Sequence, residues 1–183
     1  RTILEMGGKD FIMVDETADL ENAADGIVKA AFGFQGQKCS ACSRVIVQES
    51  VHDELVNLMV EKTKTLRVGK PDNPDNFMGA VIDEAAYNKI MSYIEVGHSE
   101  GTLQIGGSPA GDGGWFIEPT IFTDISPDDR LAQEEIFGPV LAIIKFNSFE
   151  EGINIANGTM FGLTGALFSN DRLRLETGRR ELH

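Results

Sequence analysis

Short apolar runs alternate with stretches of helical periodicity along the whole chain. Residues 10–15 (DFIMVD) hold an apolar run between two aspartates, which is the pattern of a buried strand. Residues 19–34 repeat apolar positions at helical spacing and begin at Asp19, a candidate N-cap. The same patterns predict further strands at residues 43–50, 102–107, 115–125, 140–146 and 162–170. They predict further helices at residues 51–69, 83–101, 148–160 (with Ser148 as a candidate cap) and 171–183.

The helix predicted at residues 51–69 is amphipathic and is expected to end near Gly69. Its apolar side is formed by Val51, Leu55, Leu58, Met59 and Leu66. Strands that alternate with helices of this length indicate an α/β fold, with a mostly parallel, open sheet covered by helices on both faces. A glycine-rich turn is expected at residues 108–114 (SPAGDGG). We expect one domain over residues 1–183, cut from a larger protein because both ends are abrupt.

Composition and charge exclude several classes of function. The formal net charge of −13 opposes nucleic-acid binding, which requires clustered Lys and Arg to neutralise phosphates. No apolar stretch is long enough to span a bilayer, and the N-terminus lacks the pattern of a signal peptide. We therefore expect a cytoplasmic protein without a membrane partner. The three histidines are scattered, so no metal site is expected.

Two cysteines, Cys39 and Cys42, stand in the segment GFQGQKCSACSR. They are compatible with half of a zinc site, with a redox pair, or with one nucleophile and one structural thiol. A zinc site needs a second pair of ligands that the chain lacks, and a thioredoxin-like pair should open a helix rather than precede a strand. Lys38 and the Gly36-Gln37 turn could lower the pKa of the Cys39 thiol and direct backbone N–H groups towards an oxyanion. These local features leave a buried, inert cysteine as the commoner alternative.

Two acidic segments are also candidates for chemistry. Glu5 precedes paired glycines in LEMGGKD, where a carboxylate could act as a general base beside a closely approaching ligand. Glu135 lies in QEEIFGPV, where a carboxylate could accept hydrogen bonds from a ribose diol. Taken alone, each segment is more often a solvated turn. The chain contains neither of the glycine-rich phosphate-binding motifs.

The order of these motifs is more specific than any one of them. LEMGGKD at residues 4–10, GQKCSACSR at residues 36–44 and EEIFGPV at residues 134–140 follow one another along the chain. This arrangement resembles the aldehyde dehydrogenase superfamily, and the resemblance covers essentially the whole chain as that family's catalytic domain.

The resemblance implies a role for each matching residue. Cys39 matches the nucleophile that adds to an aldehyde, gives a thiohemiacetal and, after hydride transfer to NAD(P)⁺, a thioester. Glu5 matches the general base that activates water for hydrolysis of the thioester. The oxyanion is shared in the family between the N–H of the cysteine and an asparagine from the N-terminal part. Cys42 has no corresponding role.

The resemblance also implies a cofactor site. Glu135 matches the residue that holds the nicotinamide ribose, and Phe137 matches the aromatic residue beside that ring. The backbone around Met6 and Gly7 is expected to lie along the nicotinamide. The cofactor is therefore expected to be NAD or NADP. The resemblance further implies that the family's N-terminal cofactor-binding domain and its C-terminal oligomerisation segment are expected to be absent from residues 1–183. We therefore expect the chain alone to be a poor dehydrogenase, and the full-length protein to be a homo-oligomer.

Lys38, the variant MGGKD and the phrase YNKIMSYIE are most similar to the branch that oxidises glutamate γ-semialdehyde to glutamate in proline and arginine catabolism. The alternatives are a branch acting on succinate semialdehyde or an aliphatic aldehyde, a non-catalytic domain with this fold, and a CSAC thiol–disulfide protein. In every enzymatic alternative within the family the partner is a small-molecule aldehyde.

Overall fold

A computed structural model describes residues 1–111 and 113–183 of the chain. Six strands form one sheet in the order β3-β4-β5-β2-β1-β6, and every neighbouring pair is parallel except β3 with β4. The strands are β1 (Phe11–Val14), β2 (Arg44–Gln48), β3 (Thr102–Ile105), β4 (Thr120–Thr123), β5 (Val140–Phe146) and β6 (Gly165–Phe168). The predicted α/β class with a mostly parallel sheet is confirmed.

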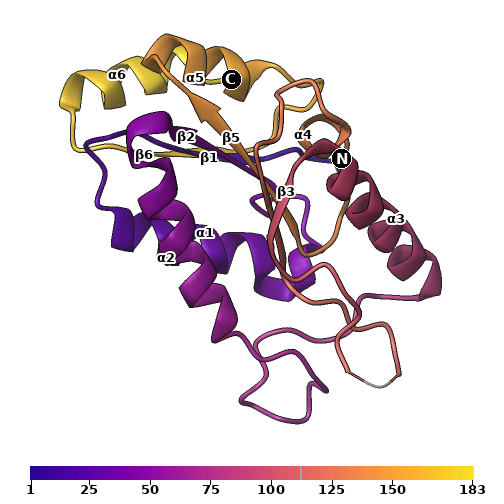
Figure 1. Ribbon diagram of the computed structural model, residues 1–183. Helices are drawn as coiled ribbons and strands as arrows, with labels where there is room; N and C mark the ends of the chain where they lie inside the picture. Colours follow the sequence, from indigo (N-terminus) through magenta and orange to yellow (C-terminus); the bar gives the residue numbers. More distant parts are fainter. Residues whose placement is uncertain (112) are drawn as a thin grey trace.

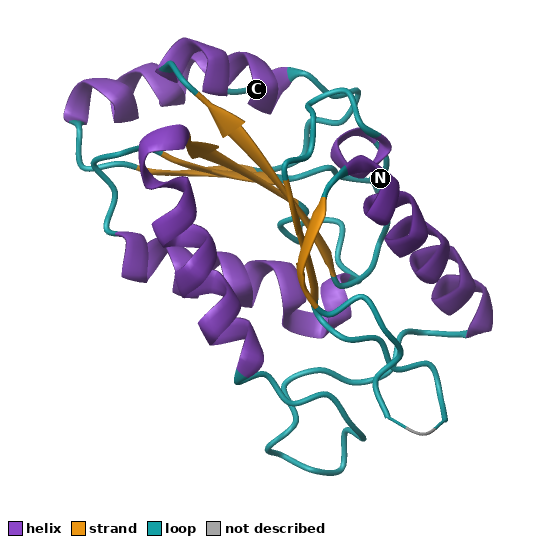
Figure 2. Ribbon diagram, viewed as in Figure 1, coloured by secondary structure: helices purple, strands orange, loops and turns teal. Residues whose placement is uncertain are grey.

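Helices cover both faces of the sheet (Figures 1 and 2). They are α1 (Leu20–Phe32), α2 (His52–Lys64), α3 (Glu84–Glu100), α4 (Arg130–Gln133), α5 (Phe149–Asn157) and α6 (Arg172–Glu181). One face packs on α1 and α2, whereas α5 and α6 lie on the other face, and α3 lies with α4 beside β3, β4 and β5. The predicted coverage of both faces is therefore confirmed.

The core follows the side-chain alternation of the strands. Ile12 and Val14 of β1 point into the cluster under α1 and α2, while Phe11 and Met13 point into the cluster under α5. Strand β5 is buried in the same way on both faces, with Leu141 and Ile143 on one side and Ala142 and Ile144 on the other. A strand buried on both faces reads as a continuous apolar run, which is why these segments were predicted from the sequence alone.

Two helix starts match the predicted caps. The side chain of Asp19 accepts a hydrogen bond from the N–H of Asn22 at 3.1 Å. Ser148 and Glu151 form a reciprocal capping box at the start of α5. Both caps are local pairs three residues apart, so the sequence determines them directly.

Other boundaries differ from the prediction. The strand expected at residues 115–125 is reduced to β4. It begins after Pro119, which has no N–H to donate to a ladder, and ends before Asp124, whose backbone is left-handed with φ 60°. Helix α1 ends at Phe32 because Phe34 has a left-handed backbone with φ 57°. Helix α2 ends at Lys64, before Gly69. The four-residue helix α4 was not predicted.

The buried side of α2 is also rotated from the predicted one. Leu55 and Met59 are buried as expected, but Val51, Leu58 and Leu66 only pack at the margin of the core. The other buried positions of α2 are His52, Val56 and Thr63. Part of the glycine-rich turn predicted at residues 108–114 lies outside the described residues, because it contains position 112.

Candidate active site

The three motifs meet at one edge of the sheet. Each motif lies just before a parallel strand. Gly8 precedes β1, Cys39 precedes β2 and Glu135 precedes β5. Parallel strands bring their amino ends to the same edge, so segments far apart in the sequence become neighbours there. A methyl group added to Gly8 would stand 2.3 Å from the carbonyl oxygen of Cys39. This close backbone approach places the first motif directly against the second.

Cys39 lies at the end of a strained turn between α1 and β2. Phe34, Gln35 and Gly36 all have positive φ angles, of 57°, 58° and 66°. A left-handed non-glycine residue costs about 1 kcal/mol or more, so the surroundings must hold the turn in place. The side-chain amide of Gln35 holds the turn. Its Nε2 donates to the carbonyl of Ala80 at 3.1 Å, and its Oε1 accepts from the N–H of Gly79 at 3.2 Å.

The thiol of Cys39 is exposed, and it is free rather than disulfide-bonded. Within residues 1–111 and 113–183, the N–H of Cys39 donates to no acceptor. An exposed thiol with an available N–H beside it can attack a carbonyl and donate to the oxyanion that forms. Lys38 extends back over the turn, since its amine lies 3.7 Å from the position of a methyl group on Gly33.

Cys42 has a different environment from Cys39. Its side chain is buried, its Sγ donates to the carbonyl of Arg44 at 3.4 Å, and burial raises the pKa of the thiol to about 12. A thiol with so high a pKa is protonated at neutral pH and is a poor nucleophile. This geometry supports the prediction that Cys42 is structural, and it disfavours reversible pairing with Cys39.

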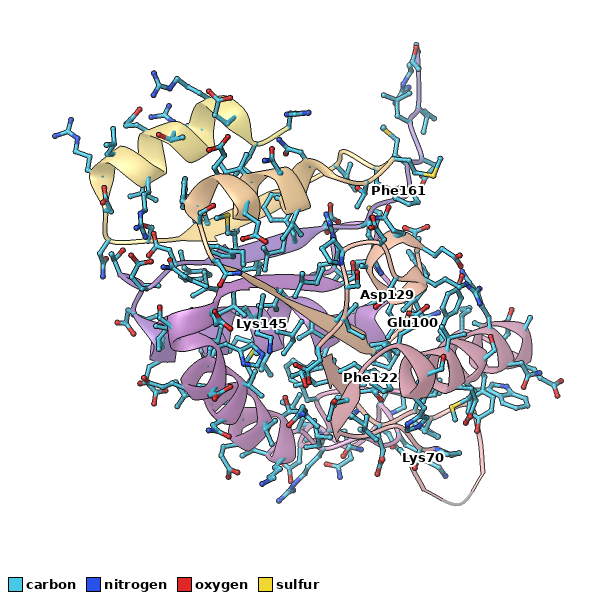
Figure 3. The ribbon with its side chains drawn as sticks, turned by 45° about the horizontal axis from the view of Figure 1, so that its top comes forward. Lys70, Glu100, Phe122, Asp129, Lys145 and Phe161 are labelled. Carbon is cyan, nitrogen blue, oxygen red and sulfur yellow. The ribbon has the colours of Figure 1, made fainter. Side chains whose placement is uncertain are left out.

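Glu5, Met6 and Gly7 are exposed and lie outside any helix or strand, in the N-terminal segment, whose beginning projects from the body of the protein (Figure 3). Glu5 is exposed, and among the described residues no hydrogen bond holds its carboxylate. Gly7 approaches the third motif, because a methyl group on it would lie 3.0 Å from Oε2 of Glu135. The structure therefore brings Gly7 to Glu135 and Gly8 to both Cys39 and Glu135, whereas the Glu5 carboxylate bonds to neither of them among the described residues.

Glu135 is fixed across the site by a backbone donor. The N–H of Gly8 donates to Glu135 Oε1 at 2.8 Å. Oε2 faces Gly7, where an added methyl group would lie 3.0 Å from it and leave little space. Phe137 has a left-handed backbone with φ 60° and exposes its ring. A carboxylate held at one oxygen beside an open glycine edge and an exposed ring fits the diol of a nicotinamide ribose.

A buried polar cluster behind the site was missed by the sequence reasoning. Arg44, at the start of β2, donates to the carbonyls of Lys9 at 3.0 Å, Ile155 at 3.1 Å and Ala156 at 3.0 Å. A guanidinium at the end of α5 is well placed to satisfy the last carbonyls of that helix. Charged residues beside an apolar run were interpreted as strand boundaries, and the sequence carries no other signal of their burial.

The same cluster contains Lys9 and Asp10, which follow the paired glycines. Burial, with repulsion from Arg44, lowers the pKa of the Lys9 amine to about 7. Burial raises the pKa of Asp10, although its carboxylate accepts a hydrogen bond from the N–H of Thr164 at 2.8 Å. These three charged residues line a cavity of about 670 Å³ between β6 and α6. The cavity does not reach Cys39 or Glu5, so it is not where the predicted nucleophile and base lie.

The sequence profile of the aldehyde dehydrogenase family matches residues 1–183. The chain belongs to this family. Within the described part of this aldehyde dehydrogenase chain, no group of three or more His, Cys, Asp or Glu side chains could hold a metal ion. Of the helices that the structure describes, none has the length and apolar character needed to cross a membrane.

Two curated relatives illustrate the similarity. The chain is 56% identical to a 1-pyrroline-5-carboxylate dehydrogenase of Anoxybacillus flavithermus and 54% identical to one of Bacillus subtilis, over 183 residues in both cases. Each alignment covers 100% of this chain and 36% of the relative. This aldehyde dehydrogenase chain therefore spans about a third of the length of the curated relatives it matches.

Solved structures agree with this assignment. A 1-pyrroline-5-carboxylate dehydrogenase from Thermus, with bound NAD, matches with a TM-score of 0.95 and 46% identity. The match covers 98% of this chain and 34% of that one. A betaine aldehyde dehydrogenase from Staphylococcus aureus, in complex with NAD⁺, matches with a TM-score of 0.93 and 34% identity over 97% of this chain and 36% of that one.

Proposed function

We propose that the chain is the catalytic domain of an NAD(P)-dependent 1-pyrroline-5-carboxylate dehydrogenase, which oxidises glutamate γ-semialdehyde to glutamate. The observation that carries this proposal is the exposed thiol of Cys39, whose backbone carbonyl lies against Gly8, while the N–H of Gly8 holds Glu135. The identity of 56% to a relative of that name supports this substrate over other aldehydes.

Cys39 is the proposed nucleophile. Its thiolate adds to the aldehyde carbon, and the N–H of Cys39 donates to the oxygen as negative charge develops there. NAD(P)⁺, when bound, supplies the acceptor for the hydride. Glu135 would hold the cofactor through the ribose diol, with Gly7 leaving room for close approach and Phe137 beside the ring.

Glu5 is the proposed general base for the second half of the reaction. A water molecule attacks the Cys39 thioester while the Glu5 carboxylate takes its proton, and the bond from carbon to sulfur breaks to release the acid and the thiolate. The extended, exposed segment that carries Glu5 gives the carboxylate freedom to move towards that water. Among the described residues no hydrogen bond fixes this carboxylate, which supports a base that acts only after acylation.

The proposal includes the compartment and the assembly. The net charge of −13 supports a small-molecule substrate over nucleic acid. We place the complete enzyme in the cytoplasm as a homo-oligomer, with no membrane partner. We expect the chain alone to be a poor dehydrogenase, because most contacts to the cofactor phosphates would come from a separate cofactor-binding domain.

A hybrid enzyme tests the proposal. The chain replaces the matching region of the Bacillus subtilis relative, and NADH formation is followed with glutamate γ-semialdehyde, succinate semialdehyde and an aliphatic aldehyde. We expect the highest kcat/KM for glutamate γ-semialdehyde and its loss in the Cys39→Ser hybrid, while the Cys42→Ser hybrid stays active. A folded hybrid that prefers another aldehyde contradicts the substrate, and activity that survives Cys39→Ser contradicts the nucleophile.

A further inference from the structure

Helix α3 turns one polar stripe towards the segment that carries Glu135. Lys89, Tyr93 and Glu100 lie on one side of the helix, because spacings of four and eleven residues rotate by only about 40° and 20°. All three contact residues 130–135, which include α4 and the two glutamates after it. This stripe was not assigned a role by the proposed mechanism.

The first two contacts hold the glutamates themselves. Lys89 Nζ donates to the backbone carbonyl of Glu135 at 2.9 Å. The hydroxyl of Tyr93 donates to Glu134 Oε2 at 2.5 Å, and Arg130 forms a bidentate pair with the same carboxylate at 3.0 Å for both bonds. The Arg130 guanidinium also lies over the Tyr93 ring, 5.3 Å from its centre. Glu134 is thus fixed from two sides, and Glu135 is held through its own main chain.

The third contact holds the start of α4. Glu100 accepts hydrogen bonds from the N–H groups of Arg130 at 3.1 Å and Leu131 at 3.0 Å. A four-residue helix is too short to be stable alone, so these bonds and the burial of Leu131 keep it formed. Figure 3 shows Glu100 and Asp129, the residue before α4, side by side. The position of the whole segment is therefore set by α3.

We propose that Lys89 and Tyr93 are positioning residues, which fix Glu135 against the N–H of Gly8 so that its second carboxylate oxygen is preset for the ribose of the cofactor. This inference rests on the proposed function, because it takes Glu135 as the ribose acceptor. The segment between α4 and β5 contains a left-handed Phe137, a conformation that persists only where surrounding contacts hold the segment. The two contacts from α3 supply that restraint.

Amide hydrogen exchange in the isolated chain tests the restraint without any cofactor. The reporter is the N–H of Gly8, whose acceptor is Glu135 Oε1. We expect Gly8 to exchange about ten times faster in the Lys89→Met/Tyr93→Phe double variant, while the core amides of β1 and β2 exchange at unchanged rates. Tyr87→Phe on the same helix and Lys145→Met, which breaks the ion pair with Asp124, are matched controls that should leave Gly8 unchanged.

The hybrid enzyme provides a readout that a purely structural role would not change. The double variant should raise the KM for NAD⁺ several-fold and leave the KM for the aldehyde unchanged, and restoring Tyr93 should recover part of the loss. Unchanged Gly8 exchange in the double variant overturns the inference, and so does faster exchange with an unchanged KM for NAD⁺. If the unmodified hybrid forms no NADH, the proposed function fails, whereas Gly8 exchange still decides whether α3 holds Glu135.

Discussion

The N–H of Gly8 donates to Glu135 Oε1 at 2.8 Å and joins two motifs that are 127 residues apart in the sequence. Gly8 also touches the carbonyl of Cys39, so one residue contacts both other motifs. The bond exists because the segments before β1, β2 and β5 lie at the same edge of a parallel sheet. Gly8 therefore contacts both the proposed nucleophile, Cys39, and the proposed cofactor-binding residue, Glu135.

Replacing Gly8 with alanine should disrupt its packing against Cys39 and Glu135. The new methyl group would stand 2.3 Å from the Cys39 carbonyl and 2.7 Å from Asp10 Oδ2, so the backbone before β2 must move. We expect Gly8→Ala to lower the free energy of unfolding by about 1–3 kcal/mol, as measured by urea denaturation. Gly162→Ala is the matched control, because a methyl group there meets nothing within 4 Å. Equal stability of the two variants would contradict the packing described at Gly8.

The two cysteines should differ sharply in their reactivity with iodoacetamide. Cys39 is exposed, whereas Cys42 is buried and burial raises the pKa of its thiol to about 12. We expect limiting reagent at neutral pH to label Cys39 alone, as scored by peptide mass spectrometry, and both residues to be labelled after unfolding in urea. Labelling of Cys42 in the folded chain would contradict its burial.

Lys9 should make stability depend on pH above neutrality. Burial lowers the pKa of its amine from 10.5 to about 7, so between these values the unfolded chain binds a proton that the folded chain has released. Stability therefore rises with pH across that window, by up to about 1.4 kcal/mol per pH unit, and the penalty is fully present below pH 7.

Lys9→Met should remove this dependence. We expect the variant to be more stable than the parent by about 2–4 kcal/mol near pH 6 and to lose that advantage above pH 10.5, as measured by urea unfolding. The surface substitution Lys64→Met, which breaks only an exposed pair with Glu61, is the control. A parallel pH profile for Lys9→Met and its parent would mean that the buried amine is charged at no net penalty.

Arg44 should contribute to stability through its three carbonyl acceptors. Removing the guanidinium breaks its bonds to the carbonyls of Lys9, Ile155 and Ala156, at about 1 kcal/mol each, and leaves Ile155 with only the N–H of Gly158 as a donor. We expect Arg44→Met to lower the free energy of unfolding by about 3 kcal/mol, with a loss of protection in α5. Arg67→Met, which breaks an exposed pair with Asp75, should change stability by less than about 0.5 kcal/mol. Similar effects of the two substitutions would contradict the buried role of Arg44.

Much of the fold could be predicted because its signals are local. The buried strand at β5 is a continuous apolar run, and the caps Asp19 and Ser148 lie within three residues of their partners. The residues that depend on distant contacts were missed. Helix α4 is held by Glu100, thirty residues earlier in the chain, and Arg44 is buried against α5.

The candidate site also has residues that the sequence predicts and contacts that it does not predict. The order of the motifs identifies Cys39, Glu5 and Glu135 as candidates. Each motif contains a glycine turn and precedes a predicted strand, so both features can be read from the sequence. The bond between Gly8 and Glu135 depends on strand order, because β5 and β1 flank β2 in the sheet. Strand order is set by long-range packing, which local periodicity does not encode. The contacts of Lys89 and Tyr93 with residues 134 and 135 depend on the same packing.

Acylation by p-nitrophenyl acetate tests whether Cys39 is the nucleophile, and it requires no cofactor. The thiolate attacks the ester carbonyl, nitrophenolate leaves, and a thioester forms that water then hydrolyses. We expect a stoichiometric burst of nitrophenolate from the chain, its loss in Cys39→Ser, and its retention in Cys42→Ser. In Glu5→Gln the burst should remain while the slower release that follows it decreases. A burst that survives Cys39→Ser, or that disappears in Cys42→Ser, would contradict the assignment of Cys39 as the nucleophile.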